Sequence, residues 1–329
     1  MLPVRFGLLG TGHMATEVAK ELRALAPSGA VLAAVASRAG DRARAFATEH
    51  GASAAYDSVD ALARDPNVDV VYIATPHIFH AAHTLACLRA GKHVLVEKPF
   101  AINATEAAGM ITCARLEKRF LMEAMWTRFL PAMVALRTQL DAQAIGRPQL
   151  LIGGGAFIPG PAAGHYLFDL ALGGGALLDA GVYLISIAEF VFGAPRRIFA
   201  SGELGMSGVD EHDTWILEFP DGGRACQYVS LRARRAPDIE ILGDAGRLHV
   251  HAPVFRPTQL TLSRVGHADD VQHHPAEGSG YRYELLEVMQ CVRAGRTESA
   301  VMPLDETLSI MRTMDEVRRQ IGLQYPGES

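Results

Sequence analysis

The chain has 329 residues, of which 49% are hydrophobic and 20% are charged, a balance that is typical of folded globular proteins and excludes intrinsic disorder. Its formal net charge of −5 offers no overall attraction to nucleic acid, so we expect no nucleic-acid partner. No uninterrupted apolar stretch approaches the roughly 20 residues that a membrane helix needs, and we expect no membrane partner either.

The N-terminal residues and the four cysteines indicate neither a secretory signal nor a disulfide framework. The N-terminus lacks the charged start, long apolar segment and cleavage site of a secretory signal. The four cysteines are far apart, with no Cys-x-x-Cys pair, which argues against a disulfide framework and a structural zinc site. His77, His80 and His83 are spaced by three, but no carboxylate or cysteine completes a metal site. We expect a cytoplasmic protein without a metal.

Short apolar runs alternate with helical patterns over the first 125 residues. Near-continuous apolar strands separated by helices are typical of a parallel sheet that is covered on both faces. Such a doubly wound Rossmann fold brings the carboxyl ends of its strands to one edge, where ligands bind. The predicted strands are 4–9, 31–36, 68–74, 93–96 and 120–122, and the predicted helices include 79–89 and 103–118.

The pattern changes after residue 125. Asp221-Gly222-Gly223 supplies a tight turn between two alternating segments, as a hairpin requires. We expect a Rossmann domain at 1–125 and an α/β domain at 126–329, with a large open, mainly antiparallel sheet and helices on one side. The predicted strands are 149–157, 197–202, 214–219, 225–231, 238–242, 246–251 and 259–264, and the predicted helices are 129–143, 176–192, 281–294 and 304–321.

The first predicted strand runs directly into the turn Gly10-Thr11-Gly12-His13-Met14-Ala15, which opens a helix. In this context the Gly-x-Gly-x-x-Ala pattern is more than an incidental glycine loop. Gly10 allows the tight turn, Gly12 lets the backbone approach a pyrophosphate, and the helix N-terminus offers free N–H groups. We expect the five residues from Gly10 to Met14 to bind a dinucleotide, namely Gly10, Thr11, Gly12, His13 and Met14.

The end of the second predicted strand indicates which dinucleotide binds. Enzymes that use NAD usually carry Asp or Glu there, whereas this chain has Ser37-Arg38, with Arg42 one turn later. Asp41 lies nearby, but we interpret it as a helix N-cap. Because guanidinium groups bind phosphate through charge-assisted hydrogen bonds, Ser37, Arg38 and Arg42 favour NADP over NAD.

Two segments carry residues suited to acid–base chemistry. Glu97-Lys98-Pro99 follows the predicted strand 93–96, beside the expected nicotinamide position. The three glycines 173–175 form a loop, which we interpret as flexible, before a helix that carries Asp179 and Tyr183 on one face. A lysine near a tyrosine hydroxyl favours the phenolate and lowers its pKa, which makes Tyr183 a usable acid or base at neutral pH.

Together these residues resemble the Gfo/Idh/MocA family of oxidoreductases, and the resemblance covers nearly the whole chain. It depends on the glycine turn, on Ala74-Thr75-Pro76 before a helix that contains His80, on Glu97-Lys98-Pro99 and on the glycine block with Asp179 and Tyr183. The segment 123–129, Glu-Ala-Met-Trp-Thr-Arg-Phe, is most similar to the branch of dimeric dihydrodiol dehydrogenases and D-xylose dehydrogenases.

The resemblance implies roles for individual residues. Lys98 and Tyr183 correspond to the catalytic pair of that branch, and Asp179 is placed to orient the substrate or the lysine. The Lys98–Pro99 bond is often cis in the family. The implied cofactor contacts include Thr75, Pro76, His80, Glu97 and Lys98, and the implied substrate contacts are Trp126, Arg128, Phe157, Asp179 and Tyr183. A homodimer that pairs through the open sheet is implied as well.

The function that follows is hydride transfer between NADP and a carbinol or carbonyl carbon of a sugar or cyclic diol, without a metal. One alternative is a non-catalytic metabolite sensor that keeps the NADP-binding fold; the intact Lys98, Asp179 and Tyr183 argue against it. Another is glycoside hydrolysis with a tightly held NAD, which Ser37-Arg38 disfavours.

Overall fold

The computed structural model describes residues 2–160 and 165–328, which fold into two compact units. Unit 1 comprises Met1–Trp126 and Glu277–Leu308, and unit 2 comprises Thr127–Ala276 and Ser309–Ser329. The sequence pattern predicts a single boundary near residue 125, whereas the chain also returns to unit 1 near its end. Polar contacts hold this returning segment: Arg293 donates to the carbonyl oxygen of Ser28 at 2.7 Å.

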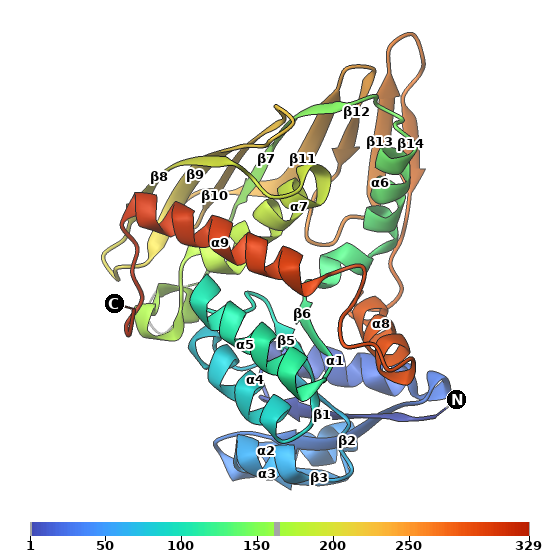
Figure 1. Cartoon of the computed structure of the whole chain (residues 1–329), viewed down its shortest axis with the longest axis vertical. Coiled ribbons are helices and arrows are strands. Elements are labelled where there is room, and N and C mark those ends of the chain that lie inside the picture. The colour runs from blue at the N-terminus through green and yellow to red at the C-terminus, as the bar shows by residue number, and fades with distance from the viewer. Residues whose placement is uncertain (1, 161–164, 329) are drawn as a thin grey trace. The chain divides into compact units, whose positions relative to one another are not determined.

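Unit 1 contains a six-stranded parallel sheet with the order β3-β2-β1-β4-β5-β6, as in the predicted doubly wound Rossmann fold (Figure 1). The order reverses between β1 and β4, and ligands of such sheets bind at the carboxyl ends of the strands near that reversal. The strands are β1 (Val4–Leu9), β2 (Ala30–Ala36), β3 (Ala54–Tyr56), β4 (Val70–Ile73), β5 (His93–Glu97) and β6 (Leu121–Ala124).

The helices of unit 1 form where the sequence offers an apolar face and a defined start. Asn103 caps α5, because its side chain accepts a hydrogen bond from the Glu106 N–H at 2.9 Å. Helix α1 buries Ala15, Val18 and Leu22 against the sheet. The α-helices of the unit are α1 (His13–Ala24), α2 (Gly40–His50), α3 (Val59–Arg64), α4 (His80–Arg89), α5 (Ala104–Glu117) and α8 (Arg282–Arg293).

Unit 2 contains an eight-stranded sheet with the order β14-β13-β12-β11-β7-β10-β9-β8. Every neighbouring pair is antiparallel except β7 and β10, which confirms the predicted mainly antiparallel sheet. The strands are β7 (Pro148–Ala156), β8 (Arg197–Leu204), β9 (Asp210–Glu218), β10 (Arg224–Ser230), β11 (Arg235–Gly243), β12 (Gly246–Val250), β13 (Gln259–Arg264) and β14 (Asp270–His273).

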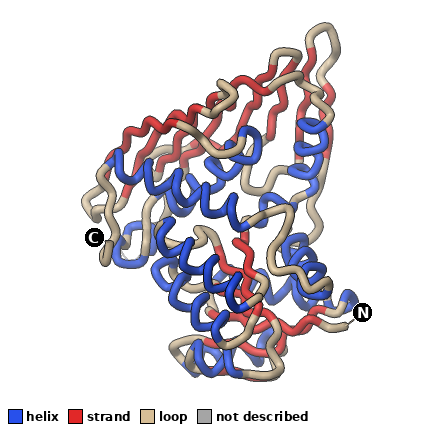
Figure 2. The backbone as a smooth tube through the Cα atoms, in the orientation of Figure 1, coloured by secondary structure: helices blue, strands red, loops and turns tan. Residues whose placement is uncertain are grey.

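Helices cover one face of this sheet and leave the other face open (Figures 1 and 2). The covering helices are α6 (Pro131–Asp141), α7 (Val182–Phe192) and the later part of α9 (Leu304–Ile321). A polar link fixes α7 to the sheet: the indole N–H of Trp215 donates to Gln227 at 2.8 Å, and the Gln227 amide donates to the Leu184 carbonyl at 2.7 Å. Trp215 is among the largest fully buried side chains of the described residues.

One helical segment of unit 2, Leu170–Phe192, is long and apolar enough by length and composition to cross a membrane. This differs from the sequence expectation, which considered only uninterrupted apolar runs. Within the structure, 67% of the apolar window of this segment is buried, as in the core helix of a folded domain. The segment contains α7 and the helical turns that precede it.

Candidate active site

The glycine turn joins β1 to α1 at the carboxyl edge of the sheet in unit 1. Gly10 has a φ of +119°, and a Cβ there would lie 2.4 Å from the carbonyl oxygen of Ala74, so only glycine fits. A Cβ at Gly12 would meet nothing within 4 Å, and no side chain caps the N-terminus of α1. Ala15, in the first turn of α1, is fully buried. The turn therefore fits the pyrophosphate of a dinucleotide, which binds to free N–H groups at a helix N-terminus.

The remaining residues of the turn differ in exposure. His13 is exposed, whereas Thr11 and Met14 are half-buried. The Tyr281 hydroxyl contacts the Met14 sulfur at 3.7 Å, and the Tyr281 ring lies 4.4 Å from the ring of Trp126. Trp126, expected to border the substrate pocket, is 4% exposed, and its ring is therefore packed against the segment that returns to unit 1.

A basic and aromatic cluster lies at the carboxyl ends of β2 and β4. The guanidinium carbon of Arg38 lies 5.4 Å from the centre of the Phe79 ring, and Phe79 stacks on His83 at 5.6 Å. His83 in turn contacts the Thr75 hydroxyl at 3.1 Å. Arg38 is exposed. The stack places an exposed guanidinium at the strand end where the 2′ group of a dinucleotide is read. Phe79 is a residue that the sequence analysis did not single out.

Helix α2 begins differently from its predicted start. Asp41 is not the N-cap: the helix starts at Gly40, Ala39 occupies the cap position, and no side chain caps it. The Asp41 carboxylate instead forms an exposed ion pair with Arg44, three residues later. Arg42 is exposed on the same turn and remains a predicted phosphate contact. The correction leaves Ser37, half-buried, and Arg38 as the polar residues at the strand end itself.

Glu97 holds the loop that carries Lys98. Glu97 is 5% exposed, and its carboxylate accepts hydrogen bonds from the Tyr72 hydroxyl and, at 3.2 Å, from the backbone N–H of Lys98. The Lys98–Pro99 bond is cis, as in many members of the family that the sequence resembles. The buried Glu123 accepts from the Phe100 N–H at 3.1 Å. These contacts hold the Glu97 carboxylate against Tyr72 and the backbone of the loop that carries Lys98.

His80 links two loops of the same edge. The ring is fully buried, with Nδ1 2.8 Å from the Pro99 carbonyl oxygen and Nε2 2.9 Å from the Thr75 carbonyl oxygen. Burial lowers the pKa of His80 to about 3, so the imidazole is neutral at physiological pH. A neutral imidazole carries one N–H, so His80 donates a hydrogen bond to one of these two carbonyl oxygens and packs against the other. The ring lies between the loops that contain Thr75 and Lys98, and no part of its side chain is exposed to a ligand.

A second buried acid lies close to Glu97. Glu284, in the first turn of α8, is fully buried, and neither of its carboxyl oxygens has a hydrogen-bond partner. Burial raises the pKa of Glu284 well above its usual value, and the charge of Glu97 raises it further. Burial likewise raises the pKa of Tyr72. Glu284 therefore keeps its proton more readily than an exposed carboxyl group does.

In unit 2, Asp179 and Tyr183 lie on one face of a continuous helical segment. Asp179 belongs to a π-helical stretch, Leu177–Gly181, and Tyr183 to the first turn of α7. Both are half-buried, whereas their neighbours Leu178 and Val182 are buried. The Tyr166 hydroxyl donates to Asp179 at 3.1 Å. Single π-helical turns are frequent at functional sites, because they shift side chains relative to a regular helix.

The glycine block before this helix is tightly packed, which corrects the interpretation of a flexible loop. A Cβ at Gly174 would lie 2.6 Å from the carbonyl oxygens of Tyr166 and Leu167. Gly173 and Gly175 have φ values of +78° and +121°. The glycines are therefore needed for close backbone approach and left-handed conformations.

The other predicted substrate contacts lie at different depths. Arg128 is 2% exposed, and its guanidinium donates to the hydroxyl of Ser186 at 3.0 Å and to its carbonyl at 2.7 Å. This side chain thus holds α7 one turn beyond Tyr183. Phe157, after the end of β7, is 36% exposed. The Tyr183 and Phe255 rings are 6.1 Å apart, and Phe255 is a neighbour that the sequence did not indicate.

Metal ligands do not gather in the described part of the chain. Within residues 2–160 and 165–328, no group of three or more His, Cys, Asp or Glu side chains could hold a metal ion. His77 and His80 lie in edge-to-face contact at 5.7 Å, and His83 contacts Thr75. The histidines at this spacing therefore pack among themselves and with the loops.

Comparisons with known proteins agree on both halves of the chain. A family model described as "Oxidoreductase family, NAD-binding Rossmann fold" (Gfo/Idh/MocA) matches residues 4–125, and the Gfo/Idh/MocA C-terminal domain matches residues 133–249. The trans-1,2-dihydrobenzene-1,2-diol dehydrogenases of Bos taurus and Homo sapiens are 36% and 35% identical to this chain, and each alignment covers 99% of both sequences.

Two solved structures of enzymes have the same fold. A 3-ketoreductase from Actinomadura kijaniata in complex with NADP and TDP-benzene has a TM-score of 0.86 and 27% identity, covering 97% of this chain and 98% of that chain. An aldose-aldose oxidoreductase from Caulobacter crescentus has a TM-score of 0.87 and 23% identity, covering 97% of each chain, and shows likeness of fold alone.

Proposed function

Because the chain belongs to the Gfo/Idh/MocA family of NAD-binding Rossmann-fold oxidoreductases, we propose that it transfers a hydride between NADP and a carbinol or carbonyl carbon of a sugar or cyclic diol. The observation that carries the proposal is the arrangement at the carboxyl edge of the sheet in unit 1. There, the open turn at Gly12 and the loop that fixes Lys98 follow β1 and β5 of the same parallel sheet.

NADP is the dinucleotide that the second strand favours. Arg38 is exposed at the end of β2 and stacked near Phe79, and the strand end carries no carboxylate that could bind ribose hydroxyls or repel a phosphate. A guanidinium binds a phosphate through charge-assisted hydrogen bonds. The similar 3-ketoreductase was solved with NADP, which supports the same choice here.

Lys98 and Tyr183 are proposed as the acid–base pair. The nicotinamide, when bound, accepts or donates the hydride. Tyr183 exchanges the proton of the substrate hydroxyl, while the Lys98 ammonium stabilises the phenolate and binds the substrate oxygen. Asp179 orients a substrate hydroxyl or the lysine. The 3-ketoreductase has also been solved with a lysine replaced by alanine and with a tyrosine replaced by phenylalanine, the same residue types as in this pair.

The test replaces the proposed acid–base hydroxyl. A screen of NADP+ reduction with aldoses and dihydrodiols, and of NADPH oxidation with dicarbonyl sugars, first identifies a substrate. Tyr183→Phe is then expected to lower kcat by about a hundredfold or more, with an unchanged Kd for NADP. Tyr283→Phe, on α8, is the matched control, because the Tyr283 hydroxyl accepts from the Glu277 N–H, and it is expected to keep full activity. Near-normal turnover of Tyr183→Phe would reject the assignment.

The open face of the eight-stranded sheet supports a homodimer. One register row crosses all eight strands on this face: Phe199, Ile216, Cys226, Ile152, Glu240, His249, Thr261 and Val271. Its apolar members are well exposed, with Phe199 and Ile152 each at 45%. A sheet face of this kind normally packs against a partner, and a second copy of the chain brings the same row to the contact.

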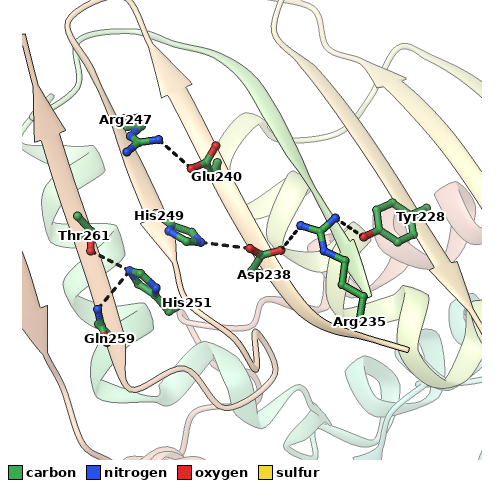
Figure 3. A network of polar contacts seen from close by, with 9 residues as sticks. All are labelled: Tyr228, Arg235, Asp238, Glu240, Arg247, His249, His251, Gln259 and Thr261. Carbon is green, nitrogen blue, oxygen red and sulfur yellow. Dashed lines mark hydrogen bonds and ion pairs between the residues drawn. The ribbon is translucent and has the colours of Figure 1, made fainter. Parts of the chain in front are cut away.

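Polar contacts continue the same face toward β13 (Figure 3). Arg235 donates to the Tyr228 hydroxyl at 2.5 Å and to Asp238 at 2.9 Å, and His249 contacts Asp238 at 3.3 Å. These side chains are held in place in the single chain, which lowers the entropy lost when a partner covers them. We propose that two copies pair through this face.

Light scattering tests the dimer. The chain is expected to show twice its mass of 35.4 kDa at micromolar concentration. Ile152→Glu places a charge in the centre of the register row and is expected to give a folded monomer, whereas Val265→Glu, on an exposed turn, is expected to leave the dimer intact. A wild-type chain that is monomeric under these conditions would contradict the proposal.

A further inference from the structure

Two buried carboxyl groups lie behind the glycine block of unit 2, on the covered face of the sheet. Asp210 and Asp213 are both on β9, and both are fully buried. The Asp210 carboxylate accepts a hydrogen bond from the backbone N–H of Leu177 at 2.6 Å. Leu177 is the first residue of the π-helical stretch that carries Asp179 and leads into Tyr183. Asp210 is thus bonded to the start of the helical segment whose side chains are proposed to act on the substrate.

The chain leaves space for both carboxyl groups. A Cβ at Gly175 would lie 1.9 Å from an Asp210 oxygen, and a Cβ at Gly202 would lie 2.1 Å from an Asp213 oxygen. Both distances are far below a real contact, so any larger residue would displace the acids. The glycine block and β8 are therefore shaped around this pair of carboxyl groups.

The pair holds a proton. Among the described residues neither carboxyl group has an ion pair, and both oxygens of Asp213 lack any hydrogen-bond donor from elsewhere. Burial raises the pKa of both acids, and the negative charge of Asp210 raises the pKa of Asp213 further. Since two carboxylates side by side in an apolar interior cannot both ionise, Asp213 keeps its proton, and its O–H donates a hydrogen bond to the Asp210 carboxylate.

The C-terminal segment holds the same block from another side. The Tyr325 hydroxyl donates to the Gly174 carbonyl oxygen at 2.6 Å. Arg318 of α9 lies over the Tyr325 ring at 5.1 Å and donates to Glu328 at 2.7 and 2.9 Å. The backbone N–H of Tyr325 also donates to Glu328 at 2.9 Å. The contacts with Arg318 and Glu328 therefore hold Tyr325 in the position from which its hydroxyl donates to the glycine block.

We propose that Asp210, through the proton that it shares with Asp213, and Tyr325 are positioning residues for Tyr183. They fix the backbone at Gly174 and Leu177, and thereby the register of the helical segment that presents Asp179 and Tyr183. The inference rests on the proposed role of Tyr183. A displacement of about 1 Å at a reacting group can lower the rate about a hundredfold, so two hydrogen bonds at the start of this segment have a large effect.

A double-mutant cycle separates positioning from general stability. Asp210→Ala leaves the Leu177 N–H without its acceptor and is expected to lower kcat between about tenfold and a hundredfold, with the Kd for NADP unchanged. In a Tyr183→Phe background the same substitution is expected to have almost no further effect, because it acts through that hydroxyl. Equal losses in both backgrounds would overturn the proposal. A normal rate in Tyr183→Phe alone would instead refute the proposed function.

Conservative variants keep the test decisive if Asp210→Ala does not fold. Asp210→Asn retains an oxygen that accepts from Leu177 and is expected to stay within about threefold of wild-type kcat. Tyr325→Phe loses the bond to Gly174 and is expected to lower kcat at least about threefold, again only when Tyr183 is present. Unchanged kcat in Tyr325→Phe would overturn the role of the C-terminal segment.

The proton shared by Asp210 and Asp213 is tested by the pH dependence of kcat/KM. The titratable group that interacts with both acids is Tyr325, which in turn lies beside Arg318 and Glu328. As pH rises, Asp213 loses its proton, the two carboxylates repel, and the bond to Leu177 is strained. Asp213→Asn carries a permanent N–H donor, so the alkaline limb of its kcat/KM profile is expected to lie at least about one pH unit higher than in the wild type. An alkaline limb at the same pH would overturn the sharing of a proton.

Discussion

Gly12→Ala adds one methyl group in the middle of the predicted phosphate-binding turn and tests the cofactor site directly. The backbone at Gly12 has a φ of −85°, which any residue adopts, and a Cβ there meets nothing within 4 Å. The folded chain therefore accommodates alanine, and the Tm without cofactor is expected to change by no more than about 1 °C. The methyl group fills the space through which the backbone approaches a pyrophosphate, so the Kd for NADP is expected to rise at least about tenfold, or roughly 1.4 kcal/mol.

Gly10→Ala is the matched control, because the same methyl group two residues earlier meets the protein itself. At Gly10 the φ is +119°, and the added Cβ lies 2.4 Å from the carbonyl oxygen of Ala74. Strain of this kind costs about 1–3 kcal/mol. For a domain of the size of unit 1, about 1 kcal/mol lowers Tm by about 2–4 °C, so a strain of about 3 kcal/mol is expected to lower Tm by about 6–12 °C.

The assay combines thermal unfolding without cofactor and titration with NADP by intrinsic fluorescence or calorimetry. Gly10→Ala is expected to lose stability, and Gly12→Ala to lose only affinity. An unchanged Kd in Gly12→Ala would remove the pyrophosphate from this turn. A similar loss of Tm in both variants would show that the turn is shaped by packing alone and refute the reasoning.

Three further outcomes follow from individual contacts. Arg38→Ala is expected to raise KM for NADP at least about tenfold while KM for NAD changes less than about twofold, because only NADP carries the 2′-phosphate; equal losses in steady-state kinetics would contradict this. The pKa of His80 is held at about 3, below its unfolded value, so the unfolding free energy is highest above about pH 6.5 and falls by at most about 1.4 kcal/mol per pH unit as pH decreases toward 3. Urea unfolding at several pH values is expected to show this slope in the wild type and a flatter slope in His80→Gln. Gln227→Leu leaves the Trp215 N–H and the Leu184 carbonyl unpaired and is expected to cost about 2–4 kcal/mol in unfolding free energy; a cost below about 1 kcal/mol would rule out the polar link.

The positions of most strands and helices follow from the sequence, because apolar periodicity and depth of burial coincide in them. The apolar run at 4–9 is β1 itself, and the alternation at 214–219 covers the second half of β9 and one residue beyond its end. Two short strands escape this reasoning. β3 has only three residues, and β14, Asp-Val-Gln-His, is polar at an edge, where backbone pairing rather than side-chain burial defines the strand.

The return of α8 to unit 1 escapes it as well. The amphipathic pattern of α8 predicts a helix with an apolar face, but not which core that face covers. The partner is set by contacts between residues far apart in the chain, such as the bond from Ser279 to Glu21 at 2.6 Å. Pairings of this range leave no local signal in a single sequence.

The candidate site shows the same limit in chemical terms. The residue types were informative, because Arg38 and His13 are exposed at the expected edge. The sequence did not indicate how deeply each side chain is buried. His80, Glu97 and Arg128 are buried and hydrogen-bonded to the loops or the helix that carry the predicted site. A polar residue near a site can either meet the ligand or hold the loop, and spacing along the chain does not distinguish these roles.

Both units use buried carboxyl groups to fix the backbone beside a proposed catalytic residue. In unit 1, Glu97 accepts from the Lys98 N–H next to the buried Glu284, whose pKa is raised. In unit 2, Asp210 accepts from the Leu177 N–H next to Asp213. A carboxylate is a stronger acceptor than a carbonyl, and its burial is tolerable when a neighbouring acid keeps its proton, because only one charge is then desolvated. Burial of each pair lowers the free energy of unfolding, but it holds the backbone beside the proposed catalytic residue in one conformation. An enzyme that must place a hydride and a proton within a fraction of an ångström gains more from that precision than from stability.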